Sequence, residues 1–313
     1  MVNLIQNENM KVYRRWRTWI MVGFMIAVVF TASLVEWYYD NDITSDTWQK
    51  QVEQQKDAME KELDDPKTGE ETKKYYENHI ALIDYRLEHN IRPEDGTMWS
   101  GINGSATLVI LITLFTVIIA GDSLAGEFST GTIKLLLIRP ASRLKILISK
   151  YVSMILFGIL LLIVLFVVSV LINGLLYKFG DMSLPMVGLD SNGDIFERNM
   201  VLNLWKTYLL NGVSTVMYVT IAFMISSAFR SSAMAIGFSI FALFAGAILM
   251  ELIQRYDWAK YVLFPNLNLA QYLEGRPYQD GMTLSFSIIM LVIYFIVFNL
   301  VSWLAFTRRD VAA

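Results

Sequence analysis

The sequence predicts an all-α integral membrane protein with six transmembrane helices, both termini in the cytoplasm, and an extracellular helical-hairpin insertion. Three observations lead to this fold class. Hydrophobic residues make up 55% of the 313 positions. They gather in runs of roughly 20, the length that an α-helix needs to cross about 30 Å of hydrocarbon. Lys and Arg are concentrated in the connections on one side of these runs, as they are in cytoplasmic loops.

The six predicted spans form one transmembrane domain, 1–313. The first span is too long for the apolar part of a signal peptide, and no A-x-A cleavage site precedes Glu36. It is therefore predicted to stay in the mature protein. Only Arg230, Ser231 and Ser232 join the fourth and fifth spans, which requires a tight antiparallel hairpin. The predicted spans are 18–35, 102–120, 148–172, 205–229, 233–253 and 284–306.

The charge of the connections predicts the orientation. Of 26 basic and 29 acidic residues, 12 basic and four acidic ones lie in the N-terminal tail, in 121–150, at Arg230 and in the C-terminal tail. This side carries a net charge of +8 and the other side −11. Because cytoplasmic connections are rich in Lys and Arg, the positive side is predicted to face the cytoplasm. We expect a multi-pass protein of a bacterial plasma membrane.

Two polar segments next to the first span are predicted to be helical. Residues 1–17 combine four basic residues with Tyr and Trp, which suits a cytoplasmic interfacial helix. Residues 37–100 are predicted to form an extracellular helical hairpin between the first and second spans, with its turn at 65–69. Two apolar stripes at helical spacing support it. They consist of Trp48, Val52, Gln55, Met59 and Leu63, and of Tyr76, Ile80, Ile83 and Leu87.

The remaining connections differ in character. The cytoplasmic loop 121–147 is predicted to contain a short helix over 127–139, capped by Ser129 or Thr130 and ended by Pro140. Residues 173–203 show no convincing periodicity. Residues 254–283 are apolar but broken by Pro265, so they are predicted to be an outer interfacial or re-entrant segment.

Motifs for chemistry are absent. The chain has no Cys, no H-E-x-x-H, no G-x-S-x-G and no phosphate-binding G-x-x-x-x-G-K-[ST], and no His lies in any span. We therefore predict no catalytic residue, no metal site and no nucleic-acid partner, and expect a protein that is not an enzyme. None of the predicted spans has an ionisable residue near its centre, which disfavours ion-coupled transport.

Neutral polar residues do occur within the spans. Thr113 and Thr116 share a face of the second span, and Asn211, Thr215 and Tyr218 share a face of the fourth. They are candidates for a substrate path. They also suit hydrogen bonds that hold helices together, and this second interpretation stays open.

The connection between the second and third spans resembles that of the type-2 ABC exporter permeases, six-helix subunits that work with a separate ATPase. Three elements carry the resemblance, followed by a span that begins near Lys150. They are Gly126-Glu127-Phe128-Ser129-Thr130-Gly131-Thr132, Leu135-Leu136-Leu137 and Arg139-Pro140-Ala141-Ser142-Arg143. The order of the spans, the basic N-terminal helix and the proline-broken outer segment also agree with that family. The long acidic 37–100 segment is a departure, since many members lack it.

The resemblance implies that this connection holds a coupling helix that docks into a cytosolic ABC ATPase. That ATPase would bind ATP and Mg²⁺, so the resemblance implies no cofactor on this chain. Glu127 would lie at the helix start, Gly131 would admit the partner backbone, and Pro140 would direct the exit. It also implies a second permease chain, as a homodimer or a related heterodimer, in contact with membrane lipid. The residues implied in coupling are Glu127, Ser129, Thr130, Gly131, Thr132, Lys134, Leu135, Arg139, Pro140 and Arg143.

The expected function is the membrane permease subunit of an ATP-driven exporter. The expected cargo is amphipathic or lipid-like, such as a peptide antibiotic, because no charged site is visible within the membrane. Two alternatives stay open, namely efflux of sodium or another small solute, and a non-transporting peptide sensor or immunity protein.

Overall fold

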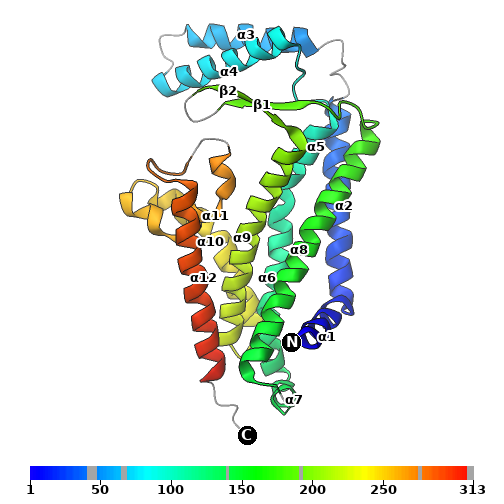
Figure 1. Ribbon diagram of the computed structural model, residues 1–313, viewed down its shortest axis with the longest axis vertical. Coiled ribbons are helices and arrows are strands. Elements are labelled where there is room, and N and C mark those ends of the chain that lie inside the picture. Colours follow the sequence, from blue (N-terminus) through cyan, green and yellow to red (C-terminus); the bar gives the residue numbers. More distant parts are fainter. Residues whose placement is uncertain (41–47, 65–68, 139–140, 190–192, 274–276, 309–313) are drawn as a thin grey trace.

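The computed structural model describes residues 1–40, 48–64, 69–138, 141–189, 193–273 and 277–308. In this part of the chain six helical segments are long and apolar enough to cross a membrane, and each overlaps one predicted span (Figure 1). The protein is thus a largely helical, multi-pass membrane protein. The segments are α2 (Trp16–Asp40), α5–η1–α6 (Met98–Ser105, Ala106–Leu108 and Val109–Ser129), α8 (Arg143–Leu176), α9 (Met200–Ala228), α10 (Ser232–Ile253) and α12 (Leu284–Thr307).

Short polar side chains begin most of these helices. A side-chain oxygen of the N-cap residue accepts a hydrogen bond from a backbone N–H of the first turn, which satisfies a donor that has no partner within the helix. The N-cap residues with such a bond are Thr97, Ser142, Asn199, Ser231 and Thr283. The apolar runs therefore begin at positions that the local sequence specifies.

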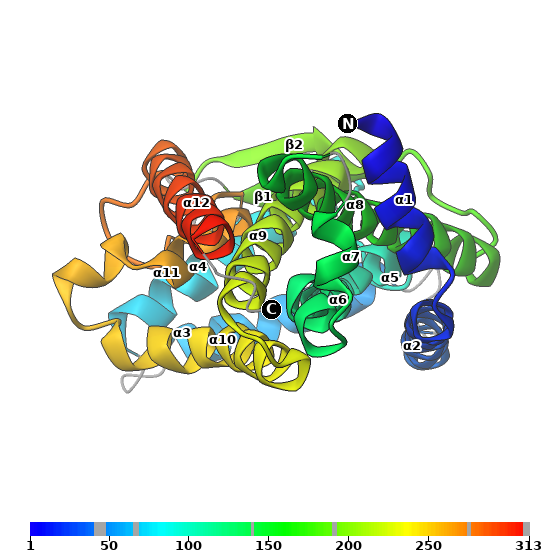
Figure 2. The same cartoon turned by 90° about the horizontal axis from the view of Figure 1, so that it is seen from below.

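The helices α6 and α9 lie at the centre of the bundle, with α2 and α12 at opposite sides (Figure 2). Small and polar residues allow the central helices to approach closely. A Cβ atom added at Gly121 of α6 would lie 3.2 Å from the backbone of Ile236 in α10. The hydroxyl groups of Thr113 in α6 and Thr215 in α9 lie 2.8 Å apart. Such contacts hold helices together in lipid, where apolar burial alone provides little driving force.

At one end of the bundle, α3 (Trp48–Leu63) and α4 (Glu70–His89) pack against each other across the ends of the long helices (Figure 1). Trp48 and Val52 of α3 are buried against Ile83 of α4, and Met59 and Leu87 extend this cluster. The apolar stripes that predict the two helices thus face each other. The turn predicted at 65–69 lies almost entirely outside the described residues.

Beneath α4 lies an antiparallel pair of strands, β1 (Pro185–Leu189) and β2 (Ile195–Asn199), that the sequence did not indicate. Two hydrogen bonds connect the pair to α4. Tyr85 donates to the Glu197 carboxylate at 3.1 Å, and Arg86 donates to the Val187 carbonyl at 3.4 Å. Neither five-residue strand, Pro-Met-Val-Gly-Leu or Ile-Phe-Glu-Arg-Asn, alternates apolar and polar residues, so the sequence pattern does not indicate a strand.

Residues 254–273 fold into three short helical turns, η2 (Asp257–Tyr261), α11 (Leu263–Leu267) and η3 (Leu269–Tyr272), between α10 and α12. Buried amide side chains replace the hydrogen bonds that a continuous helix would make. Asn266 donates to the carbonyls of Lys260 and Val262 and accepts from the Ser287 hydroxyl. Irregular backbone near a membrane requires such internal partners.

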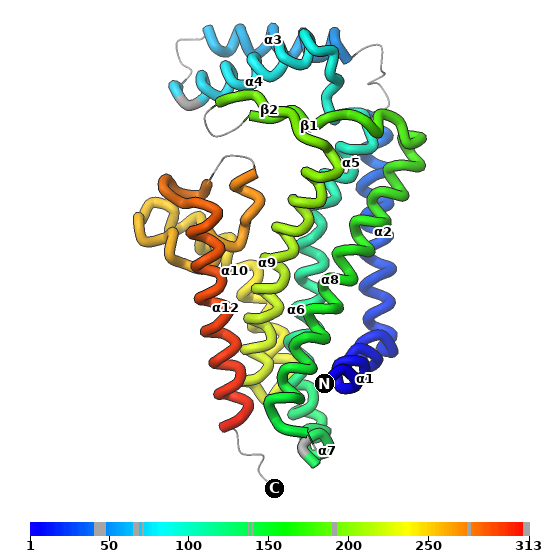
Figure 3. The backbone as a smooth tube through the Cα atoms, in the orientation of Figure 1, coloured from blue at the N-terminus to red at the C-terminus, as the bar shows by residue number. Residues whose placement is uncertain are grey.

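At the opposite end of the bundle lie α1 (Val2–Tyr13) and α7 (Ile133–Leu137). The last turn of α12 lies toward this same end (Figure 3). The predicted helix 1–17 is shorter in the structure, because α1 ends at Tyr13 and α2 begins at Trp16. Arg14 and Arg15 therefore form the corner between the two helices.

Candidate functional site

The connection between α6 and α8 holds the candidate site, and its first half is not a separate helix. The predicted N-cap positions, Ser129 and Thr130, lie at the C-terminal end of α6, and both hydroxyl groups donate to the Gly126 carbonyl. The prediction of a helix start there is wrong. The helix continues because the apolar face of the span extends through Leu124 and Ala125, which are fully buried.

Gly131 produces the sharp turn that follows. Its φ angle is +73°, a left-handed conformation that strains any residue with a Cβ atom. No atom lies within 4 Å of the position that a Cβ atom would occupy. The glycine is therefore explained by the backbone turn itself. The chain then reverses into α7, a single helical turn.

The short helix α7 has one buried side and one exposed side. Ile133 and Leu136 pack into a cluster with Leu124, Ile146 and Phe306, which anchors the turn to α6, α8 and α12. On the other side, Leu135 is 68% exposed and Ile138, directly after the helix, is 80% exposed. The exposed charged residues beside them, Lys134, Arg143 and Lys145, are all basic. This end thus has an apolar tip with a basic border, defined here as the α7 tip.

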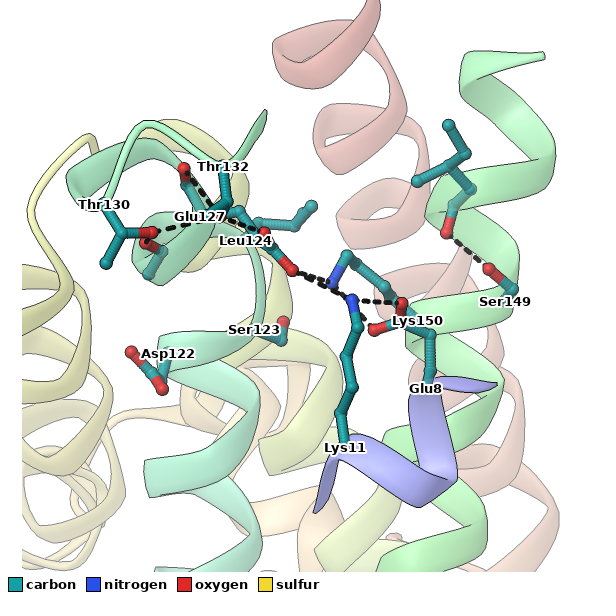
Figure 4. A network of polar contacts seen from close by, with 12 residues as sticks. Glu8, Lys11, Asp122, Ser123, Leu124, Glu127, Thr130, Thr132, Ser149 and Lys150 are labelled. Atoms are coloured by element: carbon teal, nitrogen blue, oxygen red, sulfur yellow. Dashed lines mark hydrogen bonds and ion pairs between the residues drawn. The ribbon is translucent and has the colours of Figure 1, made fainter. Parts of the chain in front are cut away.

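A charge network fixes the base of the α7 tip to its neighbours (Figure 4). The ammonium group of Lys150 in α8 lies 2.8 Å from a Glu8 oxygen and 3.1 Å from a Glu127 oxygen. Lys11 in α1 lies 2.8 Å from Glu8 and 3.2 Å from Glu127. The Thr132 hydroxyl, which precedes α7, also donates to Glu127. Helices α1, α6 and α8 are therefore joined by two carboxylates and two ammonium groups.

The network corrects the role expected of Glu127. This residue lies in the last turn of α6, where the helix dipole disfavours a negative charge, and not at a helix start. Lys11 and Lys150 supply the compensating positive charge. The side chain of Lys150 is only 3% exposed, so loss of Lys150 would leave two largely buried carboxylates with Lys11 as their one ammonium partner.

The pKa values of the α1 residues reflect this arrangement. Burial alone would raise the pKa of the Glu8 carboxyl, but the charge of Lys150 and the hydrogen bonds from Lys11 and Lys150 lower it below its ordinary value. Burial alone would lower the pKa of Lys11, but Glu8 and Glu127 raise it. Both groups are therefore ionised near neutral pH.

A third carboxylate, Asp122 of α6, connects this region to α2 and α10. Its Oδ2 atom accepts hydrogen bonds from Arg15, at 2.9 Å, and from Arg17, at the corner between α1 and α2. Its Oδ1 atom accepts a hydrogen bond from Ser232, the first residue of α10. Asp122 thus ties the N-terminal corner and the α9–α10 hairpin to α6. A cavity of about 850 Å³ is lined by Asp122 and by the two carboxylates of the network, Glu8 and Glu127.

Comparison with known proteins defines the family. A family described as protein of unknown function (DUF2705) matches residues 75–312. This chain belongs to the DUF2705 family. The uncharacterised protein YhcI of Bacillus subtilis (strain 168) is 42% identical over 315 residues, with 100% of both chains covered. The uncharacterised membrane protein YdbK of the same organism is 32% identical over 208 residues, 66% of this chain and 80% of YdbK.

The DUF2705 match contains only part of the network. Glu127, Lys150 and the α7 tip lie inside the matched residues, whereas Glu8, Lys11 and the two arginines that bind Asp122 lie before them. The similarity to YhcI extends over the whole chain, α1 included.

The remaining residues predicted for coupling are only partly brought together. Lys134 and Leu135 are exposed at the α7 tip. Arg143 donates to the Thr307 carbonyl at 3.0 Å, which ties the start of α8 to the end of α12. Arg139 and Pro140 lie outside the described residues.

The candidate substrate-path residues divide into two sets. Thr116 and Thr215 are buried, and their hydroxyl groups bond to a helix carbonyl and to Thr113. The bond between Thr215 and Thr113 joins α9 to α6, as the second interpretation expects, whereas Thr116 donates to the Ile112 carbonyl of its own helix. Thr113, Asn211 and Tyr218 line a cavity of about 320 Å³ between α6, α9, α10 and α11.

Most of the network was not predicted from the sequence. Glu8, Lys11 and Asp122 entered the prediction only as charges for orientation, and Lys150 only as a charge and as the start of a span. The sequence held one weak indication that Lys150 is buried, because this residue follows an apolar stretch and precedes the long apolar run of α8. Only the packing of α1 across α8 shows what neutralises it.

Proposed function

We propose that this protein is the membrane permease subunit of an ATP-driven exporter of the type-2 ABC class. The observation that carries the proposal is the α7 tip, where Leu135 and Ile138 are exposed on a turn that is anchored to three long helices. A separate ATPase, which would bind ATP and Mg²⁺, is the partner that we assign to this tip.

The position of the tip favours a protein partner over lipid. Trp16 and Trp19, at the α1–α2 corner, are 78% and 60% exposed, as expected for residues at a membrane–water interface. The α7 helix lies farther toward the end of the molecule than this corner (Figure 1). Large apolar side chains exposed beyond the interface would face water unless another protein covers them, and each contributes roughly 1.5–3 kcal/mol when buried.

The anchoring of the tip supports a mechanical role. An ATPase moves membrane helices only through an element that stays rigid in both of its states. The buried pairs of Lys150 with Glu8 and Glu127 connect the base of the tip to α1, α6 and α8. A displacement of α7 would therefore move these helices together.

The proposed topology follows from the charge of the connections. The end with α1 and α7 faces the cytoplasm of a bacterial cell, and the α3–α4 hairpin with β1 and β2 lies outside. The exporter contains a second permease chain, identical or related. The net charges of +8 and −11 on the two sides support this orientation.

The proposed cargo is an amphipathic or lipid-like molecule. The cavity that contains Thr113, Asn211 and Tyr218 is otherwise mostly apolar, and the described residues that line it include none with a charged side chain. A few neutral polar groups within an apolar wall suit a molecule with a small polar part. This chemistry fits a peptide antibiotic or lipid better than a sodium ion.

The test is purification of the tagged protein from its own host in mild detergent, with assays for bound ATPase subunit and ATP hydrolysis. We expect both for the wild type and for Met182→Asp, a control at an exposed apolar residue of the opposite end. The double variant Leu135→Asp/Ile138→Asp should insert normally but lose the ATPase. A wild-type protein without any ATP-hydrolysing subunit would rule out an exporter and favour the sensor or immunity protein.

A further inference from the structure

The cavity of about 850 Å³ beside α1 has an unequal distribution of charge along its wall. In the network, two carboxylates, Glu8 and Glu127, face two ammonium groups, Lys11 and Lys150. At the other part of the wall a single carboxylate, Asp122, faces two guanidinium groups. One positive charge is therefore left over at the α1–α2 corner.

The two arginines have capacity for a further anion. The side chains of Arg15 and Arg17 are 47% and 37% exposed, and both line the cavity. Both donate to the same oxygen of Asp122. The Nε atom of Arg17 is buried and has no hydrogen-bond partner in the described structure. A guanidinium presents five N–H donors in a planar fork, so most donors of this pair remain for a phosphate group.

The surface beside the corner is apolar. Trp19, Ile20 and Phe24 of α2 are more than half exposed, and they continue from the arginines along the membrane-spanning helix. Phe24 meets Phe115 of α6 edge to face, with 6.3 Å between the ring centroids. A positively charged cavity therefore opens next to an apolar strip, at the level where Trp16 marks the interface.

We propose that Arg15 and Arg17 bind the phosphate of an anionic phospholipid in this cavity, with the acyl chains along the exposed strip of α2. The singly charged phosphate would neutralise the unbalanced corner. Asp122 would compete for the same guanidinium groups, so it would limit the affinity of the site. This inference does not depend on the exporter function, because it uses only the corner between α1 and α2.

The experiment measures which lipids stay bound to the protein. The full chain is reconstituted into vesicles of equal parts phosphatidylglycerol and phosphatidylcholine, extracted in mild detergent, and analysed by native mass spectrometry. The wild type should retain phosphatidylglycerol in preference to phosphatidylcholine. Arg15→Gln/Arg17→Gln should reduce this preference on the order of 25-fold, since each basic residue near an anionic lipid contributes about fivefold.

Two further variants and one competitor make the result specific. Arg14→Gln removes an exposed charge next to the site that does not line the cavity, so it should keep the preference. Asp122→Asn should increase the preference, because it releases both guanidinium groups. Inorganic phosphate at millimolar concentration should displace little phosphatidylglycerol, because it lacks acyl chains.

Several results would overturn the proposal. Equal retention of the two lipids by the wild type would exclude a selective site, as would a double variant that retains phosphatidylglycerol like the wild type. Displacement by inorganic phosphate would indicate a site for free phosphate. If the double variant elutes as an aggregate, the test uses Arg17→Gln and Asp122→Asn instead. If both of these variants retain phosphatidylglycerol over phosphatidylcholine to the same degree as the wild type, the proposed site is refuted.

Discussion

The ammonium group of Lys150 lies 2.8 Å from the carboxylate of Glu8, a residue 142 positions earlier in the chain. Through this contact the N-terminal helix α1 is fixed to α8 inside the bundle. The same ammonium group reaches Glu127, at the end of α6. A single buried lysine therefore sets the position of α1 relative to the connection that leads to α7.

Replacement of Lys150 with Met should destabilise the protein strongly. It leaves Glu8 and Glu127 with Lys11 as their remaining ammonium partner, and breaking a buried ion pair in this way costs about 3–5 kcal/mol. Thermal unfolding in detergent provides the measurement. Lys145→Met, at an exposed position of α8, is the matched control and should change little. Equal melting temperatures for the two variants would show that Lys150 is not a structural centre.

Substitutions of Gly131 test whether the turn before α7 requires a left-handed backbone conformation. At φ +73° an Ala residue should cost about 1–2 kcal/mol, and Asn should cost less because it tolerates the left-handed region. Gly237, within α10 and with open space where a Cβ atom would lie, is the control, and Gly237→Ala should not destabilise. The order of melting temperatures at position 131 should be Gly, then Asn, then Ala. An Ala variant as stable as Gly would contradict the turn.

The stabilisation from Glu8 should disappear in acid. The folded-state pKa of Glu8 lies below the ordinary value of 4.5, so Glu8 stabilises the folded state above that pH and loses this effect as pH falls through the folded-state pKa. Glu8→Gln should therefore lower the melting temperature at pH 7 but have a diminishing effect below about pH 4.5. The measurement is the difference in melting temperature between variant and wild type at each pH. A difference that is the same at pH 7 and pH 3 would oppose this assignment.

The proposed topology predicts opposite labelling of the two ends. The chain has no Cys, so single cysteines can be introduced without background. Asn78→Cys in α4 should react with a membrane-impermeant maleimide in intact cells. Lys134→Cys in α7 should react only after the cells are opened. The reverse labelling pattern would show that the orientation is opposite to the proposed one and that α7 lies outside the cytoplasm.

Elements with a strong local pattern were the ones that the sequence predicted well. The six spans are long apolar runs, and a helix is the simplest way to satisfy their backbone groups in lipid. The stripes of Trp48, Val52 and Ile83 likewise indicated two helices that bury one face. The strands β1 and β2 were not predicted because their residues do not alternate between apolar and polar. The helix start near Glu127 was wrong because packing extends α6 past its apolar run.

By itself the sequence determined which segments are membrane helices and that one set of connections is basic. These properties depend on residues close together in the chain, namely apolar runs and charged tails. Only the tertiary structure decided that Glu8, Lys11, Glu127 and Lys150 form one network, and that Arg15 and Arg17 share Asp122 beside a cavity. The physical reason is that an ion pair buried between helices depends on how those helices cross, which no local pattern of charge specifies.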